Sequence, residues 1–223
     1  MIRTGRSTPL HHELLDIQGT ILQGDLAVPE GAPGIVLFAH GSGSSRRSPR
    51  NRLVAGTLTE AGIGALLFDL LTPEEEVDRR NVFDISLLAG RLVAATHWLA
   101  ARPEAAGRAL GYFGASTGAA AALVAAATSD IAVSAVVSRG GRPDLAGAWL
   151  PKVKAPTLLI VGGRDSEVLD LNRAAYARLS CPKRLDVVPG ATHLFEEPGT
   201  LQTVADLATG WFSEHLVREE PGP

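Results

Sequence analysis

The chain has 223 residues, of which 45% are hydrophobic and 20% are charged, as expected for a globular, soluble protein with a sizeable core. Its formal net charge of -3 gives no reason to expect nucleic acid or an anionic membrane as a partner. Cys181 is the one cysteine, so a disulfide within the chain is excluded. The start, "MIRTGRSTPLHHELLD", lacks the apolar core of a signal peptide, and no apolar run is long enough to span a bilayer. We therefore expect a cytoplasmic protein.

The predicted elements begin with a hairpin at one edge of a sheet, within residues 1–30. The segment "HHELLDIQGTILQGDLAVP" (11–29) supplies its two strands. At the other end, the polar, proline-rich "REEPGP" predicts a frayed tail over residues 217–223. No repeat or linker divides the sequence, so residues 1–223 are expected to form a single domain.

Between these ends, short apolar runs alternate with longer amphipathic segments. The run "GIVLFAHG" (34–41) is apolar at consecutive positions, which is typical of a strand covered on both faces. The segment 84–101 instead has apolar residues at helical spacing, with Asp84 as its N-cap. This alternation predicts a doubly wound, mainly parallel α/β sheet of about eight strands, with helices on both faces and little or no cap domain. Further strands are expected within 63–71, 108–114, 132–138, 156–163 and 183–190, and further helices over about 49–61, 117–127, 169–179 and 200–216.

A candidate nucleophile follows the predicted strand 108–114. The pentapeptide Gly114-Ala115-Ser116-Thr117-Gly118 lies where that strand ends and a helix opens. A strand, a tight turn and a helix around Gly-x-Ser-x-Gly form the nucleophile elbow, which exposes the serine hydroxyl above the sheet. The alternative is that glycine and alanine at these positions only allow close packing of the helix on the sheet.

A serine needs a base to act as a nucleophile at neutral pH. His193 follows the last predicted strand, on the glycine-containing loop "VVPGATHLFEEPG" (187–199), and combines a strand-end position with loop freedom. A solvated loop histidine is the alternative. The adjacent His11 and His12 diverge on a strand, so they make a poor metal site. The remaining histidines, His40, His97 and His215, lie on predicted strands or helices.

The base in turn needs an acid that orients it. Asp165 lies just past the predicted strand 156–163, while Glu167, Asp170 and Asp144 are the rival carboxylates. Ser116, Asp165 and His193 then occur in the order serine, acid, histidine, which is the chain order of α/β-hydrolases.

An oxyanion hole requires two N–H donors. We expect one from the backbone of Thr117 and the other from the loop Gly41–Ser44, most simply from Ser42, with Gly41 next to the substrate. A phosphate-binding loop is the rival interpretation of "HGSGSSRR", but this stretch lacks the Lys-Ser/Thr ending of a P-loop.

The sequence resembles the α/β-hydrolase superfamily over nearly its whole length, and within it the dienelactone hydrolase-like branch. The blocks "LFAHGSGSSRRSPRN", "LFDLLTPEEE", "GASTGAAAAL" and "GATHLFEEPG" carry the resemblance. They are similar to a bacterial group that is sometimes fused to a phosphoribosyltransferase domain, although no such second domain is recognised in this sequence. The resemblance implies a hydrolase that acts on an ester or a related acyl bond.

Two positions depart from the dienelactone hydrolase pattern. Those enzymes use a cysteine nucleophile, where this sequence has Ser116, and an arginine four residues after the histidine, where this sequence has Glu197. A glutamate repels a carboxylate, which argues against dienelactone as the substrate. Among several arginines, Arg139 is the best candidate to bind substrate, because its strand neighbours the elbow strand; it could equally brace Glu196 or Glu197. Glu197 is itself a further candidate to contact substrate, from its position after His193.

We therefore expect a serine hydrolase without a cofactor or metal, acting on a small-molecule or polymeric ester through Ser116, His193 and Asp165. Thioesterase, acyltransferase or dienelactone-type lactone hydrolase activity is the near alternative. A non-catalytic binding or scaffold domain with the same fold is the alternative of another class. The sequence leaves open whether the protein is a monomer or a homodimer.

Overall fold

The computed structural model describes residues 8–217, which contain an eight-stranded sheet with the strand order β1-β2-β4-β3-β5-β6-β7-β8. The strand pairs β1/β2 and β2/β4 are antiparallel, and every other neighbouring pair is parallel. The predicted edge hairpin and the mainly parallel sheet are therefore both present. The strands are β1 His11–Ile17, β2 Thr20–Ala27, β3 Gly34–Ala39, β4 Gly64–Phe68, β5 Ala109–Ala115, β6 Ala135–Arg139, β7 Thr157–Gly162 and β8 Lys183–Val188.

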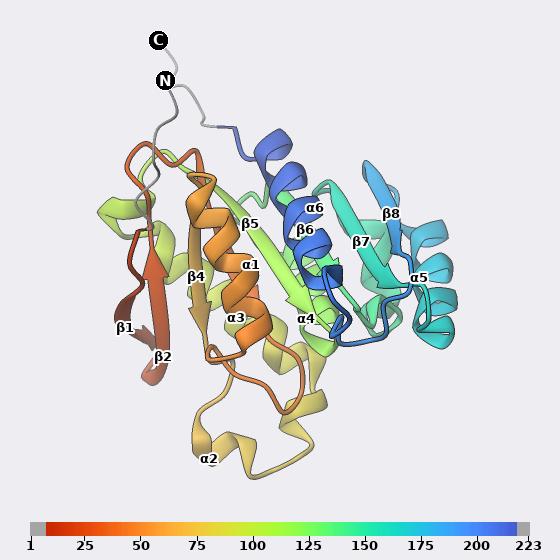
Figure 1. Cartoon of the computed structure of the whole chain (residues 1–223). Helices are drawn as coiled ribbons and strands as arrows, with labels where there is room; N and C mark the ends of the chain where they lie inside the picture. The colour runs from red at the N-terminus through yellow and green to blue at the C-terminus, as the bar shows by residue number, and fades with distance from the viewer. Residues whose placement is uncertain (1–7, 218–223) are drawn as a thin grey trace, which may run out of the picture.

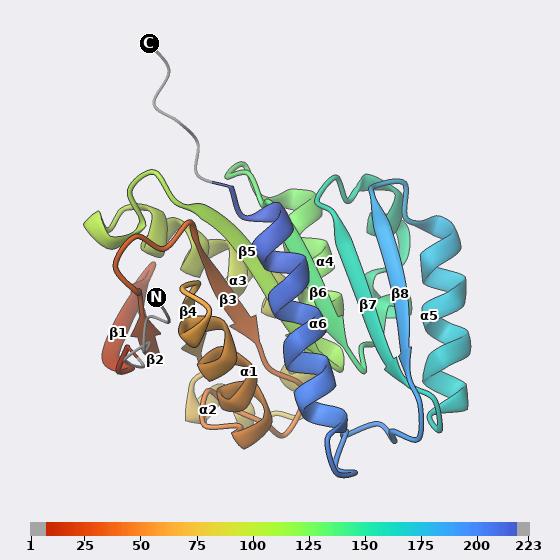
Figure 2. The same ribbon diagram turned by 45° about the horizontal axis from the view of Figure 1, so that its top comes forward.

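Helices cover both faces of the sheet (Figure 1). On one face lie α1 (Pro49–Glu60) and α6 (Thr200–His215), which cross in front of the strands in Figure 2. On the other face lie α3 (Ile85–Ala100), α4 (Thr117–Thr128) and α5 (Ser166–Arg178). The short helix α2 projects beyond the end of β4 in Figure 1, within an excursion between β4 and α3. The short helices are α2 Pro73–Glu76 and three 3-10 helices, Asn81–Phe83, Pro103–Ala105 and Pro143–Lys152.

Strand β5 is buried on both faces, which explains why its sequence is apolar at consecutive positions. Tyr112 faces α3 and α4, where its hydroxyl lies 2.7 Å from the Thr96 hydroxyl, and burial raises the pKa of Tyr112 to about 12. Phe113 faces the opposite side and packs against Phe38 of β3 with ring centroids 4.9 Å apart. The strand that leads into Ser116 is therefore fixed from both sides.

Most element boundaries agree with the sequence prediction, and Asp84 caps α3 by accepting the Leu87 N–H at 2.9 Å. Helix α5 begins at Ser166, three residues before its predicted start, because its polar first turn shows no apolar periodicity. Apart from Val217, the predicted frayed tail lies outside the described residues. Within residues 8–217, no helix combines the length and apolar character that crossing a membrane requires.

Gly118 lets the start of α4 approach β3 at backbone distance. A Cβ at this position would collide with the carbonyl oxygens of Ala39 and His40. The first glycine of the pentapeptide is equally restricted, because a Cβ at Gly114 would collide with the backbone of Ala119. Both glycines are therefore needed where backbones meet, at the turn between β5 and α4.

The loop that follows β3 is attached to the segment that follows β4 through His40. This buried ring accepts the Leu70 N–H at Nε2 (3.0 Å), and its Nδ1 donates to the Gly41 carbonyl oxygen (3.1 Å). These partners require a neutral imidazole with its proton on Nδ1. The ring therefore holds the ends of two neighbouring strands in a fixed relation.

A second attachment joins the same two segments through an ion pair. Arg46 is buried, and its guanidinium donates to Asp69 at 2.6 Å and to Gln23 at 2.7 Å. The Arg46 backbone N–H also donates to the Asp69 carboxylate at 2.7 Å. Because Arg46 engages Asp69 through both its main chain and its side chain, the residues between His40 and Arg46 are held at both ends.

We predict that Gly118→Ala destabilises the fold by about 1–3 kcal/mol, because the new methyl group meets backbone that cannot withdraw. The matched control is Gly210→Ala in α6, where a Cβ finds open space and alanine should stabilise the helix by about 0.5–1 kcal/mol. Urea unfolding of both variants measures the difference. Equal stability of the two variants would contradict the tight approach of α4 to β3.

We also predict that His40 makes the fold sensitive to acid. Burial lowers the pKa of His40 from its ordinary value of 6.5, against the opposing effects of the Gly41 hydrogen bond and of the Asp69 and Glu76 charges. A lowered pKa contributes stability that is complete above pH 6.5 and is lost as the pH falls toward the folded-state value. Urea unfolding of wild type and His40→Gln at several pH values should show their difference in stability shrinking below pH 6.5. A difference that is constant with pH would contradict the neutral, buried ring.

Candidate active site

Ser116 occupies a strained turn between β5 and α4. Its backbone angles are φ 51° and ψ -122°, outside the regions that a residue with a side chain prefers, at a cost of about 1–3 kcal/mol. Two hydrogen bonds keep the turn in this conformation. The Ser116 N–H donates to the carbonyl of Arg139, the last residue of β6 (3.3 Å), and the Arg142 N–H, three residues further on, donates to the Ser116 carbonyl (3.1 Å). The turn therefore has the geometry that the pentapeptide predicts.

Gly41 leaves room for this turn from the side of β3. A Cβ on Gly41 would lie 3.0 Å from Ser116 Cβ and 3.1 Å from the Ala115 carbonyl oxygen. Ser116 itself remains half-buried. A side chain at position 41 would therefore press directly on the serine.

Asp165 and His193 form a hydrogen-bonded pair, with Oδ2 of the carboxylate 2.7 Å from Nδ1 of the imidazole. Asp165 follows β7 at the start of α5 and is 15% exposed, while His193 lies on the loop after β8 and is 39% exposed. Because the carboxylate accepts the Nδ1 proton, the neutral ring has a free lone pair on Nε2. Of the rival acids, Asp144 pairs with Arg142 at 2.8 Å and Asp170 pairs with Arg173 at 3.1 Å.

His193 lies against the end of β6, the strand next to the elbow. A Cβ on Gly140 would come within 3.0 Å of the His193 carbonyl oxygen and 3.7 Å of its ring carbon Cε1. The residue before Gly140, Arg139, accepts a hydrogen bond from the Ser116 N–H through its carbonyl oxygen. Within the described residues, no hydrogen bond joins the Ser116 hydroxyl to the His193 ring, so the structure pairs acid with histidine and leaves the serine unpaired.

The predicted oxyanion loop contacts α4 directly. The Ser42 N–H donates to Oγ1 of Thr117 at 3.0 Å, and the Thr117 side chain is buried. As the first residue of α4, Thr117 presents a backbone N–H that has no partner within its helix. The structure therefore brings the two expected donor residues together, with the Ser42 N–H engaged by the Thr117 hydroxyl.

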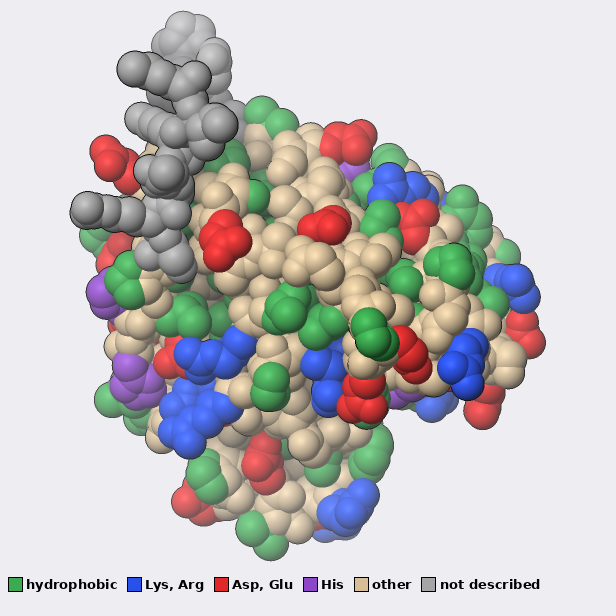
Figure 3. Space-filling model, in the orientation of Figure 1, with side chains coloured by type: hydrophobic (Ala, Val, Ile, Leu, Met, Phe, Trp, Pro, Cys, Tyr) green, Lys and Arg blue, Asp and Glu red, His purple; other side chains and the backbone are tan. Residues whose placement is uncertain are grey.

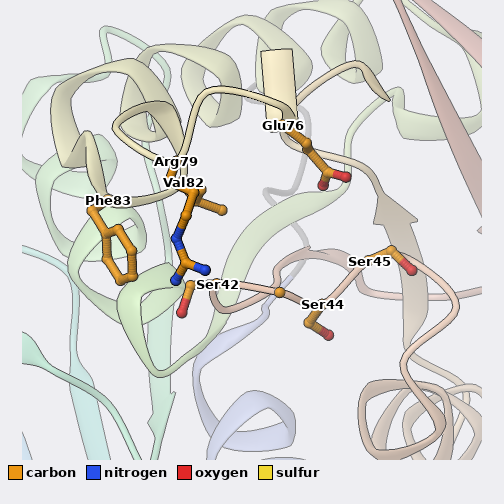
Figure 4. A pocket seen from close by; sticks show the side chains of 8 residues that line it. Ser42, Ser44, Ser45, Glu76, Arg79, Val82 and Phe83 are labelled. Carbon is orange, nitrogen blue, oxygen red and sulfur yellow. The ribbon is translucent and has the colours of Figure 1, made fainter. Parts of the chain in front are cut away.

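An open pocket of about 460 Å³ adjoins this loop. Figure 4 shows Ser42, Ser44 and Ser45 along its floor, while the Arg79 guanidinium reaches from the excursion after β4 toward Ser42. Phe83 is 52% exposed and borders the other side. The lining residues of this pocket are Ser42, Gly43, Ser44, Ser45, Glu76, Arg79, Val82 and Phe83.

Sequence reasoning did not find the part of this pocket that the excursion supplies. Val82 and Phe83 belong to the 3-10 helix Asn81–Phe83, which is too short to show helical periodicity in the sequence. The one available signal was an aromatic residue, Phe83, within the polar stretch 73–84. Which side chains of an excursion face a site depends on its three-dimensional path.

Glu197 folds back onto the loop that carries His193. Its carboxylate accepts the Thr192 N–H at 3.1 Å, and hydrogen bonding from Thr192 lowers the pKa of Glu197. Glu196 lies 3.5 Å from Arg50 of α1. Neither glutamate pairs with Arg139, which is only 7% exposed at the end of β6. In Figure 3, basic and acidic side chains are interspersed over the face shown, in keeping with the small net charge.

Among residues 8–217, no three histidine, cysteine, aspartate or glutamate side chains are grouped as metal ligands. The described part of the chain thus holds a paired carboxylate and imidazole, Asp165 and His193, and a serine on a strained turn at the end of β5.

Comparisons with known structures agree with the observed fold. A dienelactone hydrolase from Anabaena variabilis, solved by crystallography, is 55% identical with a TM-score of 0.91, covering 95% of this chain and 100% of that chain. Est1E from Butyrivibrio proteoclasticus is 16% identical with a TM-score of 0.77, covering 91% of this chain and 98% of its own, and shows the shared fold.

Two curated relatives from strains of Mycobacterium tuberculosis are each 66% identical over 200 residues, and both are named "Putative phosphoribosyl transferase". The match covers 90% of this chain and 45% of each relative, so the chain spans less than half the length of those proteins. The family model described as "Dienelactone hydrolase family" matches residues 22–209. The chain is therefore a hydrolase of the α/β type and belongs to the dienelactone hydrolase family.

Proposed function

We propose that the protein is a serine esterase that cleaves carboxylic esters through an acyl-enzyme intermediate. The observation that carries the proposal is the 2.7 Å pair of Asp165 and His193, which lies against the end of β6, the strand whose last residue is hydrogen-bonded to the strained Ser116 turn. A binding domain with no chemistry to perform has no need of both a strained serine and an oriented imidazole. The arrangement thus favours catalysis over a scaffold role.

In the proposed reaction, the Ser116 hydroxyl attacks the ester carbonyl carbon while Nε2 of His193 takes its proton. Asp165 stabilises the resulting imidazolium through Nδ1. His193 then gives the proton to the leaving alcohol, which leaves an acyl group on Ser116. Water then attacks the carbonyl carbon of this acyl ester while His193 accepts a proton from the water. His193 returns that proton to the Ser116 oxygen as the acyl–oxygen bond breaks and the carboxylic acid leaves. In the proposed reaction the serine hydroxyl would donate to Nε2 of His193 when substrate is bound.

The tetrahedral oxyanion would be stabilised by the N–H groups of Thr117 and Ser42. The Thr117 N–H is at the start of α4, where the positive end of the helix dipole would also stabilise the negative charge on the oxygen. The Ser42 N–H is held beside it by the Thr117 hydroxyl at 3.0 Å, and would be shared with the oxyanion when substrate arrives. The Thr117 hydroxyl is thereby proposed as a positioning group for the second donor.

The proposed substrate is a small or polymeric ester, since the pocket next to Ser42 is open. None of the proposed steps calls for a cofactor or a metal. The name of the mycobacterial relatives describes proteins more than twice the length of the matching segment, so it need not describe the segment that this chain matches. The proposal therefore rests on the site and not on that name.

We predict that Ser116→Ala lowers kcat for p-nitrophenyl esters by up to about six orders of magnitude, because the acyl-enzyme can no longer form. Hydrolysis of an acetate-to-decanoate series measures this loss, and the preferred chain length reports the size of the pocket. Ser134→Ala is the matched control, since Ser134 precedes β6 and lies at the opposite end of that strand from Arg139. Turnover that survives in folded Ser116→Ala protein would contradict the mechanism.

We further predict that Thr117→Val lowers kcat by up to about 10²-fold with a smaller change in KM, because the Ser42 N–H loses the group that orients it. Thr117→Ser keeps the hydroxyl and should retain most of the activity. Steady-state kinetics of the two variants on one ester provides the comparison. If valine and serine at this position gave equal kcat values, the hydroxyl would have no role in positioning Ser42.

A further inference from the structure

The pocket beside Ser42 is built on one side of the elbow strand. In the sheet order, β3 and then β4 lie on one side of β5, while β6, β7 and β8 lie on the other. The residues that line the pocket come from the loop after β3 and from the excursion after β4. Asp165 and His193 follow β7 and β8. The pocket and the acid–base pair therefore lie on opposite flanks of the strand that leads into Ser116.

These positions determine which half of an ester each flank can receive. In the proposed reaction, Nε2 of His193 gives a proton to the leaving alcohol, so the alcohol oxygen must lie within hydrogen-bond reach of that ring. The carbonyl oxygen of the ester faces the N–H groups of Thr117 and Ser42. The alcohol part then extends on the flank of His193, and the space beyond Ser42 is left for the acyl part.

The pocket has an apolar wall on the side of Ser42. Val82 and Phe83 line the pocket from the excursion after β4, and Figure 4 shows the Phe83 ring on the same side of the pocket as Ser42. Phe83 is half-exposed, and an aromatic ring gains free energy when a ligand removes its surface from water. An acyl group with an apolar or aromatic stem next to the carbonyl would cover this ring.

The opposite side of the pocket is polar. Glu76 is exposed, and its carboxylate points toward the loop with Ser44 and Ser45 in Figure 4. Among residues 8–217, no ion pair engages this carboxylate, which can therefore accept a hydrogen bond from a ligand. Within the pocket, Glu76 would repel an anion and Arg79 would repel a cation. A neutral hydroxyl is the partner that this side suits best.

We propose that this pocket binds the acyl part of the ester, with an apolar stem against Phe83 and a neutral hydroxyl at its far end next to Glu76. The inference rests on the proposed esterase function and specifies its substrate class. Hydroxylated arylalkanoyl esters have both features, because the flat ring carries its hydroxyl away from the carbonyl. Phe83 is thereby a specificity-determining residue for the acyl group.

The first test varies the two halves of the ester separately. One series keeps the p-nitrophenyl group and changes the acyl group from acetyl to 3-phenylpropanoyl and 3-(4-hydroxyphenyl)propanoyl. The other series keeps the acetyl group and compares ethyl acetate with benzyl acetate. In Phe83→Ala, kcat/KM for the phenylpropanoyl ester should fall at least about 10-fold relative to the acetyl ester, because the stem loses its packing partner. The ratio of benzyl acetate to ethyl acetate should not change.

The second test addresses the polar side of the pocket. In Glu76→Ala, the preference for the hydroxyphenyl ester over the phenyl ester should fall about 10-fold, mainly through KM. Glu76→Gln retains an acceptor oxygen and should keep part of the preference. Val77→Ala and Glu74→Ala are the matched controls, because both residues are exposed, belong to the same excursion and do not line the pocket. Both controls should keep the wild-type ratios.

Three results would overturn the proposal: an acyl ratio that Phe83→Ala leaves unchanged, an alcohol ratio that changes in its place, or an unchanged hydroxyl preference in Glu76→Ala. Binding of 4-ethylphenol to Ser116→Ala protein, with and without Phe83→Ala, separates this inference from the esterase proposal. If wild type hydrolyses none of the esters, the esterase function fails. Saturation-transfer NMR signals of 4-ethylphenol that depend on Phe83 then still support the binding pocket, and signals that are indifferent to Phe83 reject it.

Discussion

The strained backbone of Ser116 is the constraint on which the rest of the site depends. The left-handed turn lifts one hydroxyl out of the sheet edge, and the surrounding chain holds it there. Hydrogen bonds from the end of β6 clamp the peptide groups on both sides of the serine. Gly41 lets the backbone after β3 come close to the serine, and Gly114 and Gly118 let β5, α4 and β3 pack at distances that a side chain would not allow. The strain is thus maintained by tertiary structure and not by the local sequence alone.

The chemistry-bearing residues come from different strand ends, so the sheet order determines which of them meet. β5 supplies Ser116, while β7 and β8 lead into Asp165 and His193. β3 lies on the opposite side of β5 and contributes the loop with Ser42. Ser116 therefore has the Asp165–His193 pair on one flank and the loop with Ser42 on the other, because the carboxyl ends of these parallel strands lie at the same end of the sheet.

Much of this arrangement could be predicted from the sequence, because strand-end positions can be identified from short apolar runs. The eight-stranded sheet and the pairing of Asp165 with His193 follow from such positions. What could not be predicted depends on contacts that only the fold creates: the hydrogen bond from the Ser42 N–H to the Thr117 hydroxyl, and the two covered guanidinium nitrogens of Arg139 that find no partner among residues 8–217. An arginine looks the same in a sequence whether a carboxylate lies beside it or not.

The two attachments between the loop after β3 and the segment after β4 have an evolutionary consequence. His40 holds Leu70 and Arg46 holds Asp69, immediately before the excursion that borders the pocket. Insertions beyond Leu70 can therefore reshape the border of the pocket while the loop that carries Ser42 keeps both attachments. Substitutions at His40, Arg46 or Asp69 would instead release that loop without changing the length of the excursion.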